Sequence, residues 1–149
     1  MQKFLSLLAL LTFALSLAAQ NPHCQQVGGA VSTNFLDQTS TSGTASGDLK
    51  GAIGVDIVSI SNGPNGTTVF HNQHHWVTES GDTLFLKNAD ATAFPASGPL
   101  VAISYSNGVE VAGGTGRFAK TKGKLAVWGA ADLQRQQIVL RYEGEICTE

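Results

Sequence analysis

The chain has 149 residues, of which nine are basic and eleven are acidic, and charged residues make up only 13% of it. This length suits one domain with a single sizeable core. Without a basic excess, a nucleic-acid partner is not expected, because phosphate binding requires clustered lysine and arginine. Few charges together with abundant Gly, Ser and Thr favour a fold built from strands.

Residues 1–19 are predicted to form a secretory signal peptide. Lys3 supplies a short positive start, residues 4–17 are almost wholly apolar, and Ala18 and Ala19 suit a signal peptidase. Cys24 comes too late for a lipoprotein anchor, and no later apolar run reaches the ~18 residues of a membrane span. We therefore expect residues 20–149 to be a single exported domain, secreted or periplasmic, with no membrane contact after signal removal.

The two cysteines, Cys24 and Cys147, lie near the two ends of the expected mature chain. In an exported protein, this placement favours one disulfide that joins the first strand to the last. Two unpaired thiols are the alternative. A metal site is not expected, because two sulfurs have only His23 nearby to complete a ligand set.

Apolar and polar residues alternate with period two through most of the chain, and a helical period is nearly absent. The extended segments are predicted at residues 27–37, 44–50, 52–61, 67–78, 83–87, 100–112, 124–131 and 137–147. The sixth of them has a candidate bulge at Asn107 and Gly108. Residues 89–98 are expected to be irregular, because Pro95 and Pro99 exclude a central strand.

The number and regular spacing of these segments predict an all-β fold, a closed eight-stranded antiparallel β-barrel. Closure removes the exposed edges that an open sheet would leave. A disulfide between the terminal strands fits this arrangement, since the first and last strands of such a barrel are neighbours. An open two-sheet sandwich is the rival architecture.

The glycine-rich stretch at residues 111–123, VAGGTGRFAKTKG, contains a G-x-G-x-x-A pattern of the dinucleotide-binding kind. That motif requires a following helix, whereas another strand is predicted here. A phosphate-binding loop also fails, because six residues instead of four separate Gly116 from Gly123. We interpret the stretch as a corner between two barrel strands, with Phe118 packed beneath it and Arg117 exposed.

The longer segment VAGGTGRFAKTKGKLAVWG resembles the GGTGRF-x-x-x-x-G signature of the allene oxide cyclase barrel superfamily, which includes the dirigent proteins. HHWVTESGDTLF and the final RYEGEIC look most similar to its small secreted members, largely bacterial and uncharacterised. The resemblance spans about residues 27–147 and implies an eight-stranded barrel. Plant members cyclise an epoxide or steer radical coupling inside the barrel. The acidic residues they use find no match here, so the resemblance assigns no catalytic residue.

Residues 71–82, HNQHHWVTESGD, carry the main candidates for ligand contact. On a strand, His71 and His75 share one face but lie about 13 Å apart, which is too far for a single metal ion. His74 and Trp76 share the other face, and the sequence alone does not say which face lines the interior. The candidate ligand-binding residues are His71, His74, His75, Trp76, Glu79 and Arg117. Structural roles are the alternative, namely histidines bonded across the ladder, an aromatic core residue and a solvated corner charge.

Three functions follow from these observations. The first is a barrel that binds a small apolar or amphipathic molecule without changing it. The second is a cyclase- or isomerase-like enzyme, which only the resemblance implies. The third is a structural or interaction module with a filled core. No Ser-His-Asp order with a supporting motif appears, no cofactor is expected, and neither the catalytic residues nor the oligomeric state is indicated.

Overall fold

The computed structural model describes residues 23–149, so the predicted signal peptide at residues 1–19 lies outside the described residues. Ten strands and two single turns of 3-10 helix make up this part of the chain. They are β1 (His23–Phe35), β2 (Ser40–Ala45), β3 (Gly51–Asn62), η1 (Pro64–Gly66), β4 (Thr68–Thr78), β5 (Thr83–Leu86), β6 (Ala89–Ala93), β7 (Leu100–Ser104), β8 (Val109–Gly114), η2 (Gly116–Phe118), β9 (Thr121–Asp132) and β10 (Gln137–Thr148). Within residues 23–149, no helix has the length and apolar character needed to cross a membrane.

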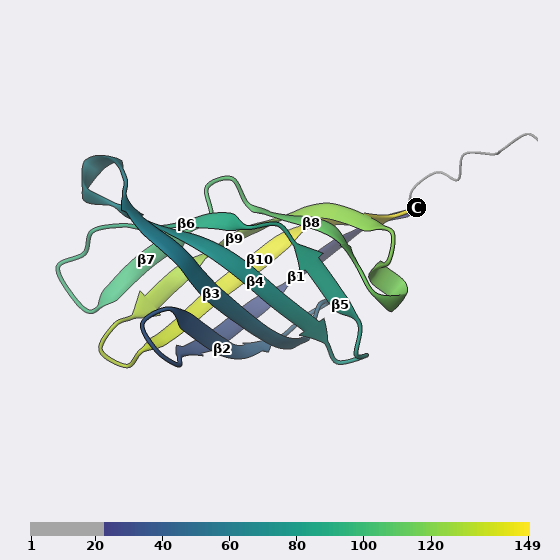
Figure 1. The fold of residues 1–149 in the computed structure, drawn as a ribbon, viewed down its shortest axis with the longest axis horizontal. Coiled ribbons are helices and arrows are strands. Elements are labelled where there is room, and N and C mark those ends of the chain that lie inside the picture. Colours follow the sequence, from purple (N-terminus) through teal and green to yellow (C-terminus); the bar gives the residue numbers. More distant parts are fainter. Residues whose placement is uncertain (1–22) are drawn as a thin grey trace, which may run out of the picture.

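Antiparallel pairing closes the sheet into a barrel, because β10 pairs with both β1 and β9. Strands β5 and β6 follow one another along β4, and β7 and β8 follow one another along β9. Ten strands therefore fill eight positions around the barrel (Figure 1). The predicted closed eight-stranded antiparallel β-barrel is confirmed, and the sandwich alternative is wrong.

Three of the sequence predictions differ from the structure. The single segment predicted at residues 100–112 is two strands, β7 and β8, separated by a turn at residues 105–108. β2 ends at Ala45, and residues 46–50 form the turn to β3, where Gly47 adopts a φ of 85° that favours glycine. β6 occupies residues that were expected to be irregular. The prolines do not prevent it, because Pro95 and Pro99 both follow the end of the strand.

Side chains close the end of the barrel at which the turn between β2 and β3 lies, which is at the right of Figure 1. The Trp76 indole packs edge-on against the Tyr142 ring, with 5.2 Å between the ring centroids. Trp76 Nε1 donates to the Leu49 carbonyl at 2.7 Å, and Tyr142 Oη donates to the Ser46 carbonyl at 2.7 Å. These bonds hold the turn between β2 and β3 across the barrel end, where the Leu49 side chain is fully buried.

The opposite end, at the left of Figure 1, carries four loops. They are residues 36–39, 63–67, 94–99 and 133–136. Large apolar side chains are exposed in or beside three of these loops, namely Leu36, Phe94, Leu100 and Leu133. This end therefore presents an apolar rim.

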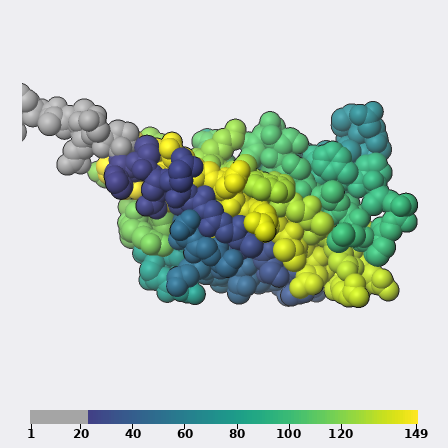
Figure 2. Space-filling view, turned by 180° about the vertical axis from the view of Figure 1, so that it is seen from behind, coloured from purple at the N-terminus to yellow at the C-terminus, as the bar shows by residue number. Residues whose placement is uncertain are grey.

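The predicted disulfide is confirmed. Cys24 and Cys147 are directly opposite one another in the β1–β10 ladder and are joined across 123 positions of sequence. Figure 2 shows the two terminal strands, purple and yellow, side by side on one face of the barrel. The bond is consistent with an oxidising compartment, as expected outside the cell or in a periplasm.

The glycine-rich stretch forms the corner between β8 and β9. Phe118 is buried beneath it and Arg117 is exposed, as predicted. Thr115 fixes the corner to the start of β5, because its backbone N donates to the Thr83 carbonyl at 2.9 Å and its Oγ1 accepts from Thr83 N at 2.8 Å. Gly116 has a φ of 50°, and a Cβ there would overlap the Asp82 carboxylate. The glycines of this stretch therefore allow the backbone to turn between β8 and β9.

Candidate ligand-binding site

The orientation of β4 determines which predicted side chains can meet a ligand inside the barrel. Asn72, His74 and Trp76 are buried and point inward, whereas Gln73 and His75 alternate with them on the exposed outer face. The inward residues are opposed by apolar partners on β3, with Ile53 beside Trp76 and Val55 beside His74. The interior face of β4 is therefore the one that carries His74.

A cavity of about 310 Å³ occupies the open half of the barrel. Its deep end lies against Trp76 and Tyr142, and its wall reaches the rim at Phe94 and Leu133. Most of the lining is aliphatic or aromatic. A predominantly apolar cavity of this size with a few polar groups is typical of small-molecule sites.

The polar groups of the cavity wall converge on one phenol. Asn72 Nδ2 donates to Tyr105 Oη at 3.1 Å, and Tyr105 Oη lies 3.0 Å from His74 Nε2. The rings of His74 and Tyr105 are tilted against one another with centroids 5.4 Å apart. Tyr105 follows the end of β7, so the three side chains form a bridge over β6, the strand between β7 and β4.

Burial keeps this group uncharged at neutral pH. Desolvation, with a smaller contribution from neighbouring His75, lowers the pKa of His74 to about 4. Desolvation likewise raises the pKa of Tyr105 to about 12, against a smaller opposing effect of the Asn72 hydrogen bond. Because Tyr105 Oη accepts from Asn72 Nδ2, its own proton is available to His74 Nε2, and we assign the neutral imidazole the tautomer that carries its proton on Nδ1.

Three buried polar atoms have no hydrogen-bond partner among the described residues. They are Thr41 Oγ1, Asn72 Oδ1 and His74 Nδ1. Thr41, Asn72 and His74 are only 5%, 4% and 8% exposed, and all three line the cavity. Such atoms are few in folded proteins, and each costs roughly 1–3 kcal/mol when it stays unpaired.

His71 and His75 lie on the outer face of the barrel, each beside an aspartate. His75 Nε2 is 2.9 Å from Asp56 Oδ2, and His71 Nδ1 is 2.6 Å from Asp90 Oδ1. Ser61 Oγ lies 3.0 Å from the other nitrogen of His71. Both histidines thus bond across the ladder, which is the structural role that the sequence analysis left open.

Ser61, His71 and Asp90 have the connectivity of a catalytic triad, although no sequence motif indicates it. Acyl transfer also needs a substrate pocket and donors for an oxyanion. Ser61 is exposed on the outside of β3, and none of the three side chains lines the cavity. We interpret the row as a surface hydrogen-bond network.

Glu79 and Arg117 also lie outside the cavity. Glu79 forms an ion pair with Lys50 at 2.8 Å, and Arg117 Nε lies 3.9 Å from Asp82. Of the six candidate residues, the structure brings His74 and Trp76 into the cavity and leaves the other four on the surface. Sequence reasoning missed Thr41, Asn72 and Tyr105.

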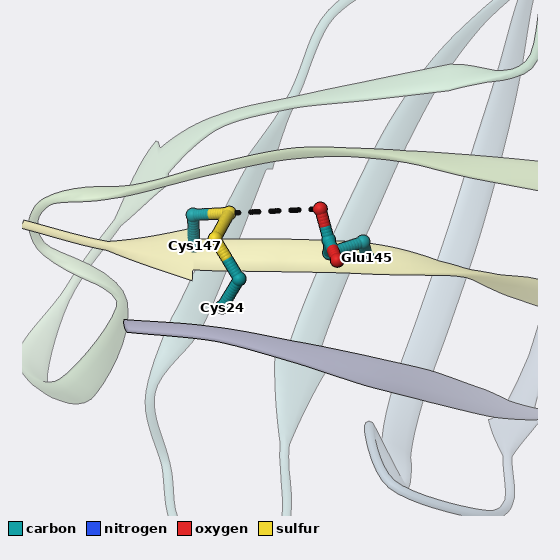
Figure 3. Close-up of side chains that lie close together, drawn as sticks. All are labelled: Cys24, Glu145 and Cys147. Carbon is teal, nitrogen blue, oxygen red and sulfur yellow. Dashed lines mark hydrogen bonds between the residues drawn. A yellow bond between two sulfur atoms is a disulfide. The ribbon is translucent and has the colours of Figure 1, made fainter. Parts of the chain in front are cut away.

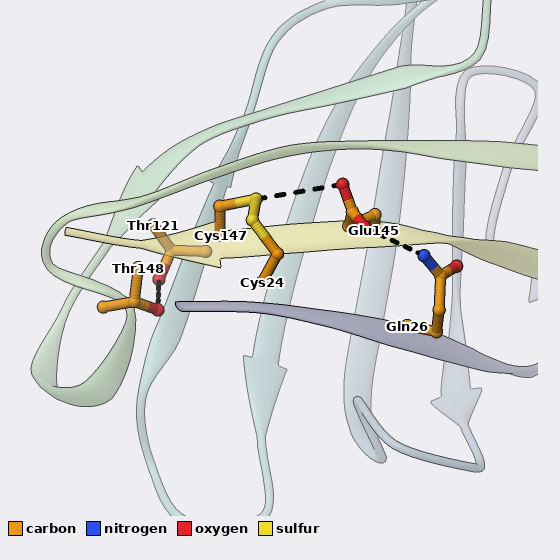
Figure 4. Close-up of a disulfide and its surroundings, with 6 residues drawn as sticks. All are labelled: Cys24, Gln26, Thr121, Glu145, Cys147 and Thr148. Carbon is orange, nitrogen blue, oxygen red and sulfur yellow. Dashed lines mark hydrogen bonds between the residues drawn. A yellow bond between two sulfur atoms is a disulfide. The ribbon is translucent and has the colours of Figure 1, made fainter. Parts of the chain in front are cut away.

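One further cluster lies at the disulfide. The two sulfurs and a carboxylate oxygen of Glu145 are all within 4.8 Å of one another (Figure 3). Metal binding would need thiolates, and here the sulfurs are bonded to each other, so the cluster is not a metal site in the oxidised protein. Glu145 instead accepts from Gln26 Nε2 at 3.0 Å, and Thr121 pairs with Thr148 beside the bond (Figure 4).

Comparison with protein-family models, curated proteins and solved structures found no match to this chain. The support for the candidate site is therefore the geometry described above.

Proposed function

We propose that this protein is a secreted barrel that binds a small apolar or amphipathic molecule. The observation that carries the proposal is the apolar cavity, which reaches the barrel rim and whose lining includes three residues that each have an unpartnered buried polar atom, Thr41, Asn72 and His74. A module with a filled core would leave neither a cavity of about 310 Å³ nor orphaned polar groups inside it. The disulfide supports export to an oxidising compartment.

The enzyme alternative, a cyclase or isomerase of the allene oxide cyclase or dirigent type, has one observation in its favour. His74 and Tyr105 form a hydrogen-bonded pair inside the cavity. A pKa of about 4 makes His74 a weak base, and a pKa of about 12 makes Tyr105 a weak acid. Both values are far from the neutral range in which proton transfer is efficient, so we place binding first.

Binding can be tested with an uncharged fluorescent dye, N-phenyl-1-naphthylamine, titrated into protein refolded from denaturant to remove any co-purified ligand. Ala91→Phe and Ala93→Phe would each fill part of the cavity, since both alanines line it. Ala102→Phe on β7 is the control, because Ala102 is exposed on the outer face.

We expect the dye to bind with a stoichiometry of one, and to bind at least about tenfold more weakly to each cavity-filling variant. The Ala102→Phe protein should bind like the original chain. Circular dichroism would verify that each variant is folded. Absence of dye binding, or equal binding to all three variants, would refute the proposed function.

A further inference from the structure

The unpartnered atoms inside the cavity have definite hydrogen-bonding roles. Because Asn72 Nδ2 donates to Tyr105, its Oδ1 is left as an acceptor. In the tautomer assigned above, Tyr105 Oη donates to His74 Nε2, and the Nδ1 of His74 is left as a donor. One wall of the cavity thus includes a residue with a free acceptor and a residue with a free donor, two positions apart on β4 and about 7 Å along the strand.

The cavity offers no charge to a ligand. Within the part of the chain that the structure describes, no Lys, Arg, Asp or Glu side chain lines it. A carboxylate, phosphate or ammonium would lose its hydration there and gain no counter-ion, at a cost of several kcal/mol. An uncharged group would lose less, and it would regain hydrogen bonds from Asn72 and His74.

The position of Asn72 and His74 along the cavity indicates which end of a ligand would enter first. His74 is next in the inward row to Trp76 at the deep end, whereas Thr41 is the second residue of β2 and follows the rim loop at residues 36–39. From His74 to the rim, the wall is mainly apolar, as at Phe70, Ile103 and Leu133. An amphipathic molecule would satisfy both regions if its polar end entered first.

We infer that the ligand ends in an uncharged group that both donates and accepts hydrogen bonds, a hydroxyl or a carboxamide, and that Asn72 and His74 bind this group at the deep end of the cavity. The inference rests on the proposed function and adds the class of head group and its direction. Thr41, near the rim-side start of β2, is a further polar residue of the lining.

Displacement of the bound dye by matched small molecules tests the inference. Decan-1-ol and 1-methoxynonane are isomers, but only the alcohol donates a hydrogen bond, which Asn72 Oδ1 requires. Decanoate and decylammonium at pH 7 provide the two charged heads. In the original protein we expect decan-1-ol to bind at least about tenfold more tightly than the ether and both ions.

Asn72→Leu removes the acceptor, so the preference for the alcohol over the ether should disappear. Gln73→Leu, on the outer face of the same strand, should preserve it. The comparison of ligands in the original protein needs no variant, so it remains decisive if Asn72→Leu does not fold.

The possible results separate the two proposals. If the dye does not bind, both the proposed function and this inference fail. If the dye binds and Ala91→Phe blocks it, the function stands. The inference would then be overturned by equal affinities for the alcohol and the ether, by tight binding of decanoate, or by an unchanged preference in Asn72→Leu. Each of these results would mean that water, not the ligand, binds the polar atoms.

Discussion

Tyr105 Oη lies 3.0 Å from Nε2 of His74 across the inner face of the barrel. The two residues are 31 positions apart, and β6 separates their strands in the sheet. The contact depends on barrel closure, and it occupies Nε2 of the imidazole, so that Nδ1 is the nitrogen left without a partner.

The depressed pKa of His74 should make folding stability depend on pH. The folded protein holds this imidazole neutral down to about pH 4, whereas the unfolded chain protonates it near 6.5. Between these values the unfolded state binds more protons, so stability falls as pH decreases from about 6.5 to about 4. The full effect is on the order of 3 kcal/mol. Urea unfolding of the original protein and of His74→Gln at several pH values would measure it.

The variant should lose most of this pH dependence, because glutamine does not titrate. His75→Gln on the outer face is the control and should retain it. If the free energy of unfolding changed with pH in the same way for the original protein and for His74→Gln, this would show that His74 is hydrated in solution.

Thr41→Val should stabilise the ligand-free protein. Valine has nearly the shape of threonine and removes a buried hydroxyl that lacks a partner, so we expect a gain of about 1 kcal/mol in the free energy of unfolding. Thr44→Val on the exposed face of the same strand should change stability little. Destabilisation by Thr41→Val, measured by urea unfolding, would mean that the hydroxyl is paired in solution.

The sequence predicts the barrel and its disulfide because both follow from local alternation and from the position of Cys24 and Cys147. It also places His74 and Trp76 on one face of a strand. It does not say which face is inside, because both faces of that strand carry histidine. Only the register with β3 decides, since apolar residues such as Val55 lie opposite the inward set.

The missed residues have a physical explanation. Tyr105 meets His74 only after the barrel closes, and Thr41 lies in a strand that the sequence analysis placed four or five residues too late. Asn72 had an available signal, because it lies two residues before His74 and therefore shares its face. The Ser61–His71–Asp90 row could not be found, since its members come from three strands.

The Ser61–His71–Asp90 row should show no acyl-transfer activity. Ser61 is exposed on an outer strand face, where water competes for each hydrogen bond of the row. We expect a fluorophosphonate probe to leave Ser61 unlabelled. Ser61→Ala should change the free energy of unfolding by less than about 1 kcal/mol. Labelling of the original protein that is lost in Ser61→Ala but kept in Ser59→Ala would contradict this interpretation.

The disulfide should contribute strongly to stability because it closes nearly the whole described chain. In the chain-entropy treatment, a loop across 123 positions corresponds to about 5 kcal/mol, and measured values are often lower. The ladder between β1 and β10 holds the same two strands together, so the reduced protein should keep the barrel and unfold at lower urea. Cys24→Ala/Cys147→Ala, compared with the oxidised protein by urea unfolding, would give the difference without reductant. A change below about 1 kcal/mol would mean that the unfolded chain is already compact enough to keep its ends close.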